Sequence, residues 1–536
     1  LQLHTLHPIE YFHVFNEPSD EHLAEAKRFV DWLVKTGQNY FQWTELATVD
    51  WDSWRPYAQS IVDYAHSRGV RVGAVVQIWG GASLQNNYVL VKTADGWQSQ
   101  MDAQLDKMMT VSWDALELAL GEFISADPQV VIDWLNHAVE HVDGAHPGVE
   151  VDVQNHVGNY PNLYVQYQGQ PVYYYHLPQF ADPRLGQSVH TLSLFDLYRD
   201  WGTYKEPDFH FQHDYILREL PSRRVTYFPE SAYWISADDD VPLFLPEYIH
   251  ARWLDVSTLT SEVRGLGLPP LEGHLTFSSG HEWNYWLTDY LTAKMLWEPS
   301  QPLSYFLDRY TSAFGSCGAD IGSALSSFLD LQTHYLFDER LLAYVQGENG
   351  TVDEGYLLGY ETHPKRVAFE DVLAMSDQDR ASFERTVVGE LAAMADAMDP
   401  LEKSVAARCR GADATIASFC DELWDGMEID VLRARHTVAL YRAVLDLAAH
   451  ADGSRDLAEA RALTGVAAKV VARREPHYRF PLHDLVDAYP NATAYSFGYL
   501  RQAHTLCYWT RQEIQVQTLL EDGTPASVAH LPSCND

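Results

Sequence analysis

The strongest constraint on the fold is an alternation of two sequence patterns over roughly the first 300 residues. Short runs rich in aromatic and β-branched residues, which are typical of strands, are each followed by a longer run with the apolar spacing of a helix. Strands that alternate with helices form parallel sheets, because each helix returns the chain to the edge where the next strand starts. The pattern predicts strands at 10–15, 39–44, 71–78, 150–154, 188–194, 224–228 and 274–278.

These strands leave two arrangements to compare, a closed barrel and an open doubly wound sheet. The open sheet usually carries a glycine-rich phosphate-binding turn after its first strand. The first predicted strand here runs instead into Asn16-Glu17-Pro18. We therefore predict an α/β fold of the (β/α)8 type, a TIM barrel with one strand missed or distorted.

The predicted barrel occupies residues 1–300, with a helical insertion at about 82–148 and a tyrosine-rich hairpin at 163–175. Beyond about residue 302 the strand pattern ends. Apolar residues from Val387 to Val405 recur at alternating spacings of four and three, which is typical of packing between helices. Residues 301–536 are therefore predicted to form an all-α C-terminal domain.

The charge balance excludes some partners. The chain has 75 acidic and 37 basic residues, a formal net charge of -38. A surface this negative repels phosphate backbones and anionic lipids, so no nucleic acid partner is expected. No stretch of 18 consecutive apolar residues predicts a membrane span. An acidic surface suits a secreted or extracellular setting, where counterions screen its self-repulsion. The sequence does not predict the oligomeric state.

The cysteines all lie in the C-terminal region. None forms a CxxC pair, so a zinc ribbon or thioredoxin-type site is not expected. One or two disulfides would fit an exported protein, and buried unreactive thiols are the alternative. The residues are Cys317, Cys409, Cys420, Cys507 and Cys534.

Catalytic groups in such a barrel project from the carboxyl ends of the strands. Here most strands lead into hydrogen-bonding groups mixed with large aromatics. Carboxylates and amides can hold sugar hydroxyls, while indole and phenol rings cover the C–H face of the sugar. The same anionic groups could alternatively bind a divalent metal or a cationic ligand. The predicted substrate-binding residues are Glu17, Glu45, Gln77, Trp79, Asn155, His156, Tyr233, Trp234, His281, Trp283, Tyr285 and Trp286.

Two glutamates, Glu230 and Glu282, each follow a predicted strand within an aromatic-rich segment. Glycoside hydrolysis uses two carboxyl groups, one as acid and one as nucleophile or base. Aromatic surroundings raise a carboxyl pKa by desolvation, which suits the acid. We predict that they are the catalytic pair, with the roles unassigned. The alternative is that Glu230 caps a helix and Glu282 braces an arginine or the backbone.

Glu17 and the histidines each resemble part of a known catalytic motif, but their positions along the chain do not match that motif. Asn16-Glu17-Pro18 is similar to the acid/base motif of retaining barrel glycosidases, but there the motif follows the fourth strand, so Glu17 keeps only a substrate-contact role. Amidohydrolase-type barrels place a His-x-His pair at the end of their first strand, and none occurs here. His210 and His213 lie three apart in the sequence. No metal and no cofactor are therefore predicted.

The segments 229–234 and 280–290 resemble the late-barrel segments of α-glucuronidase-like and α-N-acetylglucosaminidase-like glycosidases and of related uncharacterised barrel proteins. Those enzymes also append a helical domain to the barrel, whereas their N-terminal accessory β-domain has no counterpart ahead of residue 10. The resemblance implies a glycosidase that cleaves an oligosaccharide or polysaccharide. The alternatives are a non-catalytic carbohydrate-binding or scaffold protein of an extracellular assembly and a metal-dependent hydrolase.

Overall fold

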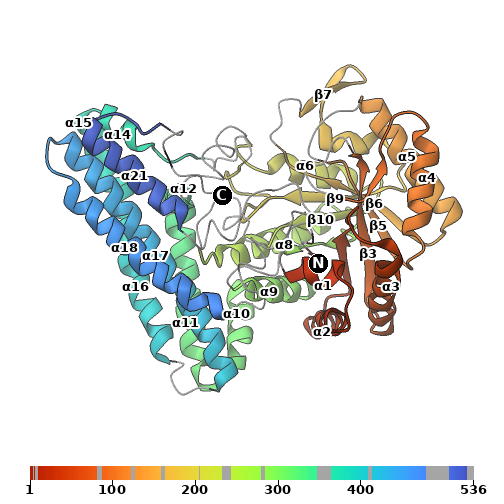
Figure 1. Cartoon of the computed structure of the whole chain (residues 1–536), viewed down its shortest axis with the longest axis horizontal. Coiled ribbons are helices and arrows are strands. Elements are labelled where there is room, and N and C mark those ends of the chain that lie inside the picture. The colour runs from red at the N-terminus through yellow and green to blue at the C-terminus, as the bar shows by residue number, and fades with distance from the viewer. Residues whose placement is uncertain are drawn as a thin grey trace.

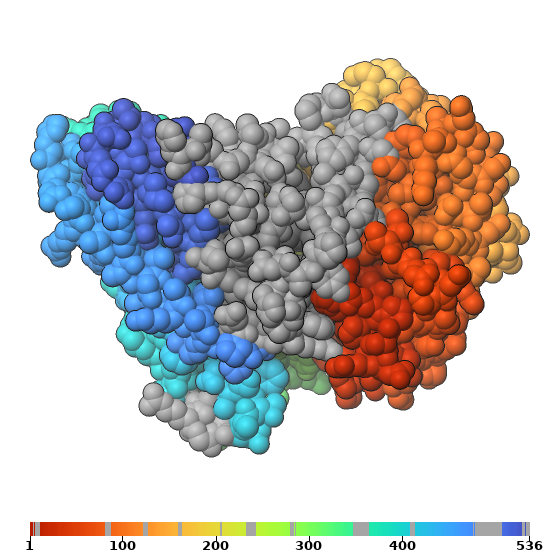
Figure 2. Space-filling view, viewed as in Figure 1, coloured from red at the N-terminus to blue at the C-terminus, as the bar shows by residue number. Residues whose placement is uncertain are grey.

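The computed structural model describes most of the chain. It consists of a barrel of parallel strands wrapped by helices and a helical C-terminal region (Figure 1). In the space-filling view these two parts occupy opposite ends of the long axis (Figure 2). The described residues are 1–3, 5, 10–80, 87–121, 127–158, 163–203, 206–231, 243–278, 284–346, 364–408, 413–477, 506–527 and 531.

The barrel strands pair in parallel in the order β11-β10-β9-β6-β5-β3-β2-β1-β12. β11 and β12 are successive parts of one stretch, residues 273–278, which pairs with β10 on one side and β1 on the other. The ring of strands is therefore closed. The barrel strands are β1 (Gln2–Leu3), β2 (Tyr40–Thr44), β3 (Arg71–Trp79), β5 (Ala115–Ala119), β6 (Glu150–Asn155), β9 (Gly186–Thr191), β10 (Val225–Pro229), β11 (Gly273–His274) and β12 (Phe277–Ser278).

Helices cover the outside of the ring, and local signals set their ends. At the start of α2 the Ser19 hydroxyl accepts a hydrogen bond from the His22 N–H at 3.0 Å. The same helix stops at Gly37, whose φ of 89° is the left-handed conformation that favours glycine. The covering helices are α1 (Glu10–Asn16), α2 (Asp20–Thr36), α3 (Trp51–Ser67), α4 (Trp97–Met108), α5 (Pro128–Ala145), α6 (His210–Glu219), α8 (Glu247–Gly265) and α9 (Tyr285–Trp297).

The first predicted strand, 10–15, is wrong, because this segment is helix α1. Tyr11 and Phe15 are four residues apart, and both rings pack edge-on against Phe29 of α2. The segment therefore has the aromatic composition of a strand but the spacing of a helix. The first barrel strand is β1, which has only two residues and so shows no periodicity.

The predicted helical insertion at 82–148 contains a barrel strand, β5, between α4 and α5. β5 pairs with β3 on one side and β6 on the other. Its sequence, Ala-Leu-Glu-Leu-Ala, consists of strong helix formers, so its composition conceals the strand. Burial between two neighbouring strands overrides that propensity.

Several other predictions are confirmed. The tyrosine-rich segment forms an antiparallel hairpin of β7 (Tyr164–Tyr167) and β8 (Gln170–Tyr173). The four- and three-residue stripe lies largely on α16 (Gly389–Arg408), where Leu391 and Met398 are buried. Strands β2, β3, β6, β9 and β10 fall within a few residues of their predicted ranges.

The C-terminal region is built around the long helix α17 (Ala414–Ala448). Asp430 of this helix accepts hydrogen bonds from the Phe244 N–H at 3.0 Å and the Gln332 side chain at 2.9 Å. These contacts connect the helical region to the segment before α8. The other principal helices are α10 (Leu303–Thr311), α11 (Gly318–Gln332), α14 (Phe369–Ala374), α15 (Asp377–Phe383), α18 (Ser454–Arg474) and α21 (Cys507–Asp522).

Two features bear on the environment of the protein. Cys420 and Cys507 are each disulfide-bonded, which is one of the two alternatives for the cysteines of this region. Among the helices of the described ranges, none combines the length and apolarity needed to cross a membrane.

Candidate functional site

Glu230 lies directly after β10 at the carboxyl end of the barrel, and only 3% of it is exposed. The backbone N–H of Ser193 donates a short hydrogen bond to its Oε2 atom. Ser193 has a φ of 47°, a left-handed conformation uncommon for serine. Burial raises the pKa of Glu230 to about 8, against the opposing effects of the Ser193 N–H and the Arg252 charge. At neutral pH the carboxyl group is therefore largely protonated.

The neighbour of Glu230 on β9 is His190, whose Nε2 atom lies 3.4 Å from Oε1 of the glutamate. The other ring nitrogen, Nδ1, is 2.7 Å from the Phe228 carbonyl oxygen, to which it must donate. Burial lowers the pKa of His190 to about 4, so the ring is neutral and its Nε2 carries a lone pair. A protonated Glu230 can donate to that lone pair. The two residues form an uncharged acid–imidazole pair.

His156, at the end of β6, extends this group. Its ring lies 5.1 Å from the His190 ring. Burial lowers the pKa of His156 to about 3, with the nearby His190 acting in the same direction. Its Nδ1 donates a short hydrogen bond to the Val157 carbonyl. Of the predicted residues, the structure thus brings Glu230 and His156 to one place, with His190 between them.

Arg252 of α8 supports the backbone beneath Glu230. Its guanidinium donates to the Glu230 carbonyl oxygen at 3.0 Å and to the Phe195 carbonyl oxygen at 2.6 Å. It also forms an ion pair with Asp255 at 3.2 Å. Arg252 therefore fixes the segments after β9 and β10 relative to each other. No sequence pattern pointed to it, because its role depends on segments 20 to 60 residues away.

Glu45 follows β2 at the same end of the barrel and is fully buried. Burial raises the pKa of Glu45 well above its ordinary value, and the Trp43 indole offsets only part of that effect. Burial therefore favours the protonated form of Glu45. A neutral acid can donate a hydrogen bond to a ligand oxygen but is a poor nucleophile.

Three other predicted residues are engaged by the protein itself. Gln77 accepts from the Asn87 amide at 2.7 Å and donates to the Trp79 carbonyl oxygen at 2.9 Å. The Trp79 ring stacks on Trp134 of α5, with centroids 5.2 Å apart. The Asn155 amide donates to the Tyr175 carbonyl oxygen at 2.6 Å. These contacts order the ends of β3 and β6.

Two further predicted residues have partners within the protein. Glu17 forms a hydrogen-bonded pair with His13 at 2.9 Å, within the turn after α1. Trp286 donates its indole N–H to Glu422 of α17 at 3.1 Å and packs against Phe419, so it belongs to the contact between barrel and helical region.

The remaining predicted residues lie outside the described part of the chain. They are Glu282, Tyr233, Trp234, His281 and Trp283, together with the side chain of Tyr285.

The amino ends of the strands form a different surface. A cavity of about 660 Å³ opens there, lined by residues that include Tyr40, Arg71, Glu150 and Glu272. In barrels of this kind the amino-terminal face serves stability, and chemistry takes place at the carboxyl ends. The Glu230 group is therefore the candidate active site.

The fold and this site define the chain as a (β/α)8-type barrel protein with an appended helical region. No protein-family model and no curated protein matches it. Solved structures similar to it include the O-GlcNAc hydrolase of Thermobaculum terrenum, at 11% identity over 94% of each chain and a TM-score of 0.41. CpGH84B matches at 9% identity over 94% of this chain and 76% of that one, with a TM-score of 0.44.

An endo-1,4-beta-mannanase from Rhizomucor miehei matches at 8% identity over 54% of this chain and 93% of the other, with a TM-score of 0.35. Several of the similar structures are thus glycoside hydrolases, and others are enzymes of different kinds, such as a sugar phosphate isomerase/epimerase. Identities and scores this low assign no residue and no substrate.

Proposed function

We propose that this protein is a glycoside hydrolase that cleaves an oligosaccharide or polysaccharide, with Glu230 as the general acid. The observation that carries the proposal is the protonated Glu230 carboxyl against the neutral His190 ring at the carboxyl end of the barrel. A glycosidic oxygen needs a proton as the bond to the sugar breaks, and a carboxyl group that is still protonated at neutral pH can supply it.

The second carboxylate of the proposal is Glu282. Strand β12 is the neighbour of the segment that carries Glu230, because Glu230 bridges Phe277. Glu282 follows four residues after the last residue of β12 in sequence. A separation of about 5 Å would give retention and ~6.5–9.5 Å inversion of the anomeric configuration. The configuration of the first product, measured by NMR, distinguishes the two.

Within the proposal, the other polar groups of this end bind the sugar. In its protonated form, which burial favours, Glu45 donates a hydrogen bond to a substrate hydroxyl. His156 lies beyond His190 and does not compete for the proton of Glu230. No cofactor enters the reaction. We further propose that the protein is exported. Cys420 and Cys507 are each disulfide-bonded, and disulfides persist in oxidising compartments.

The test is a Glu230→Gln variant assayed on a panel of aryl glycosides and polysaccharides. Loss of a general acid should lower kcat by about 10²–10⁴-fold on substrates with poor leaving groups. The loss should be much smaller on dinitrophenyl glycosides, whose leaving group needs no proton. Glu150→Gln, at the amino end of β6, is the matched control and should retain full activity.

Three outcomes would overturn the assignment. Equal losses of kcat on substrates with good and with poor leaving groups would show that Glu230 is not the general acid. Glycan binding without turnover in the unmodified protein would favour the non-catalytic alternative, and activity lost with a chelator but kept in Glu230→Gln would favour a metal-dependent hydrolase.

A further inference from the structure

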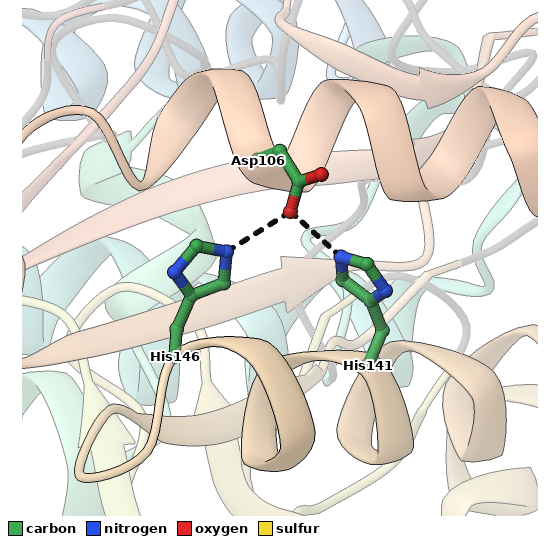
Figure 3. A group of neighbouring side chains, drawn as sticks. All are labelled: Asp106, His141 and His146. Atoms are coloured by element: carbon green, nitrogen blue, oxygen red, sulfur yellow. Dashed lines mark hydrogen bonds and ion pairs between the residues drawn. The ribbon is translucent and has the colours of Figure 1, made fainter.

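The outer wall of the barrel carries a row of alternating histidines and aspartates between α4 and α5. Asp102 and Asp106 are four residues apart on α4, and His137 and His141 are four apart on α5. Residues at this spacing lie on one face of a helix. His146, which ends α5, completes the row, and Figure 3 shows it on the opposite side of Asp106 from His141.

The contacts in this row are continuous. His137 Nε2 lies 2.7 Å from Asp102 Oδ1, and His141 Nδ1 lies 3.1 Å from the same oxygen. On its other side, His141 Nε2 lies 2.8 Å from Asp106 Oδ1. His146 Nε2 lies 3.0 Å from that same Asp106 oxygen (Figure 3). Asp106 therefore meets two imidazole nitrogens at one atom.

The number of ring protons makes this arrangement unusual. A neutral imidazole has one N–H and one lone pair. If His141 donates Nδ1–H to Asp102, its Nε2 lone pair faces the Asp106 carboxylate. Two lone pairs facing each other repel unless a cation, either a proton or a metal ion, lies between them.

The geometry suits a metal ion of the zinc type. The three ligand atoms from Asp106, His141 and His146 all lie within 4.8 Å of one another. Ligand atoms around a tetrahedral zinc at ~2.0–2.1 Å are about 3.3 Å apart. Asp106 is more than half exposed, so its side chain can shift slightly to admit the ion, and solvent can reach the fourth position.

Asp102 provides a second, independent feature of a metal site. Histidines that bind metals almost always donate their other ring nitrogen to a carboxylate or carbonyl, which fixes the ring and its tautomer. The carboxylate within reach of His141 Nδ1 is Asp102, whose Oδ1 lies 3.1 Å away. His137 in turn holds Asp102, and the Trp97 ring packs edge-on against His137.

The second group of metal-capable side chains, Asp200, Asp208 and His210, lacks these features. It has one histidine instead of two. His210 Nε2 lies 2.9 Å from the Tyr198 carbonyl oxygen, to which it must donate, so that nitrogen offers no lone pair.

We propose that Asp106, His141 and His146 bind Zn²⁺ or a similar divalent transition metal, with solvent as the fourth ligand and Asp102 as the positioning residue. The ion joins α4 to the end of α5, directly before β6. The site lies on the outer wall of the barrel, and its role is to hold two covering helices together. It is independent of the proposed glycosidase chemistry.

The test is a zinc titration of the chelator-treated protein by calorimetry. The unmodified protein should bind one equivalent more than the His141→Gln variant, and Asp106→Asn should lose the same equivalent. Asp102→Asn should retain the site with affinity lowered about 10–100-fold, as expected for an orienting residue. His210→Gln is the control and should keep the equivalent.

A second readout does not depend on the variants. Co²⁺ added to the unmodified protein should give the visible absorption of a four- or five-coordinate site, and the melting temperature should rise with added zinc. Equal zinc stoichiometry in the unmodified protein and His141→Gln, or loss of the equivalent in His210→Gln, would overturn the proposal.

Discussion

The protonation of Glu230 results from opposing effects of neighbours on different elements. The Ser193 N–H and the Arg252 guanidinium both favour the ionised form, and burial outweighs them, so the pKa stands at about 8. His190, neutral through its own burial, provides an acceptor for the proton. A group with these neighbours should control how both activity and stability depend on pH.

The first prediction concerns activity against pH. The proposed acid must be protonated, so kcat/KM should fall as pH rises through about 8. In Glu230→Gln, the residual hydrolysis of a dinitrophenyl glycoside should show no such limb. A fall centred near pH 5 would contradict the assignment of the acid.

Stability should depend on pH in a related way. In the unfolded chain Glu230 ionises near 4.5, whereas in the folded protein it keeps its proton up to about pH 8. The unfolded state thus binds fewer protons in this window, and the free energy of unfolding falls as pH rises from 4.5 to about 8. Glu117, whose pKa is also raised to about 8, contributes to the pH dependence in the same direction. The contribution of Glu230 is therefore measured as the difference in the free energy of unfolding, from urea unfolding, between the unmodified protein and Glu230→Gln. That difference should shrink below pH 4.5, because Glu230 is then protonated in both the folded and the unfolded state.

Within the barrel, single glycines on the strands make room for large polar side chains on neighbouring strands. A Cβ atom added at Gly73 of β3 would lie 2.0 Å from the Tyr40 hydroxyl of β2. One added at Gly186 of β9 would lie 1.7 Å from an Asp152 carboxylate oxygen of β6. The amino-terminal layer of the barrel is therefore packed by pairing glycine with a large partner.

Gly73→Ala should consequently destabilise the protein by about 1–3 kcal/mol through overpacking. Adding Tyr40→Phe removes the clashing hydroxyl and should restore part of that loss, as measured by urea unfolding of the two single variants and the double variant. Simple additivity of the two changes would show that the hydroxyl is not the obstacle.

At the scale of the whole molecule, the barrel and the helical region meet where α17 passes close to the segments before α8 and α9. A Cβ atom at Gly426 of α17 would lie 2.6 Å from the Phe244 Cβ. Glu422, one turn earlier, accepts hydrogen bonds from the Asn284 N–H at 2.6 Å and the Trp286 indole. The close approach of α17 thus depends on one residue without a side chain.

Gly426→Ala should therefore destabilise the protein by about 1–3 kcal/mol, although glycine to alanine in a helix normally stabilises it. Gly465 of α18 is the matched control, since a Cβ there meets nothing within 4 Å. Gly465→Ala should stabilise the protein by about 0.5–1 kcal/mol. The melting temperatures of the two variants should move in opposite directions, and an upward shift in both would show that α17 lies farther from the barrel.

The features that the sequence determined are those encoded over a few residues. The caps at Ser19 and Gly37, the tyrosine-rich hairpin and the stripe on α16 follow from local conformational preference and periodicity, which operate within one or two turns. These were sufficient for the class of fold and for placing Glu230 after a strand.

Only the tertiary structure decided the rest, because long-range pairing leaves no periodic trace in the chain. β1 has only two residues and β5 has a helix-like sequence, and both are strands only because they pair with neighbouring strands. His190 meets Glu230 across 40 residues, and Asp106 meets His141 across 35, through adjacent strands and packed helices respectively. Burial and proximity, which set the pKa of Glu230 and the proposed metal site, arise only when the barrel closes.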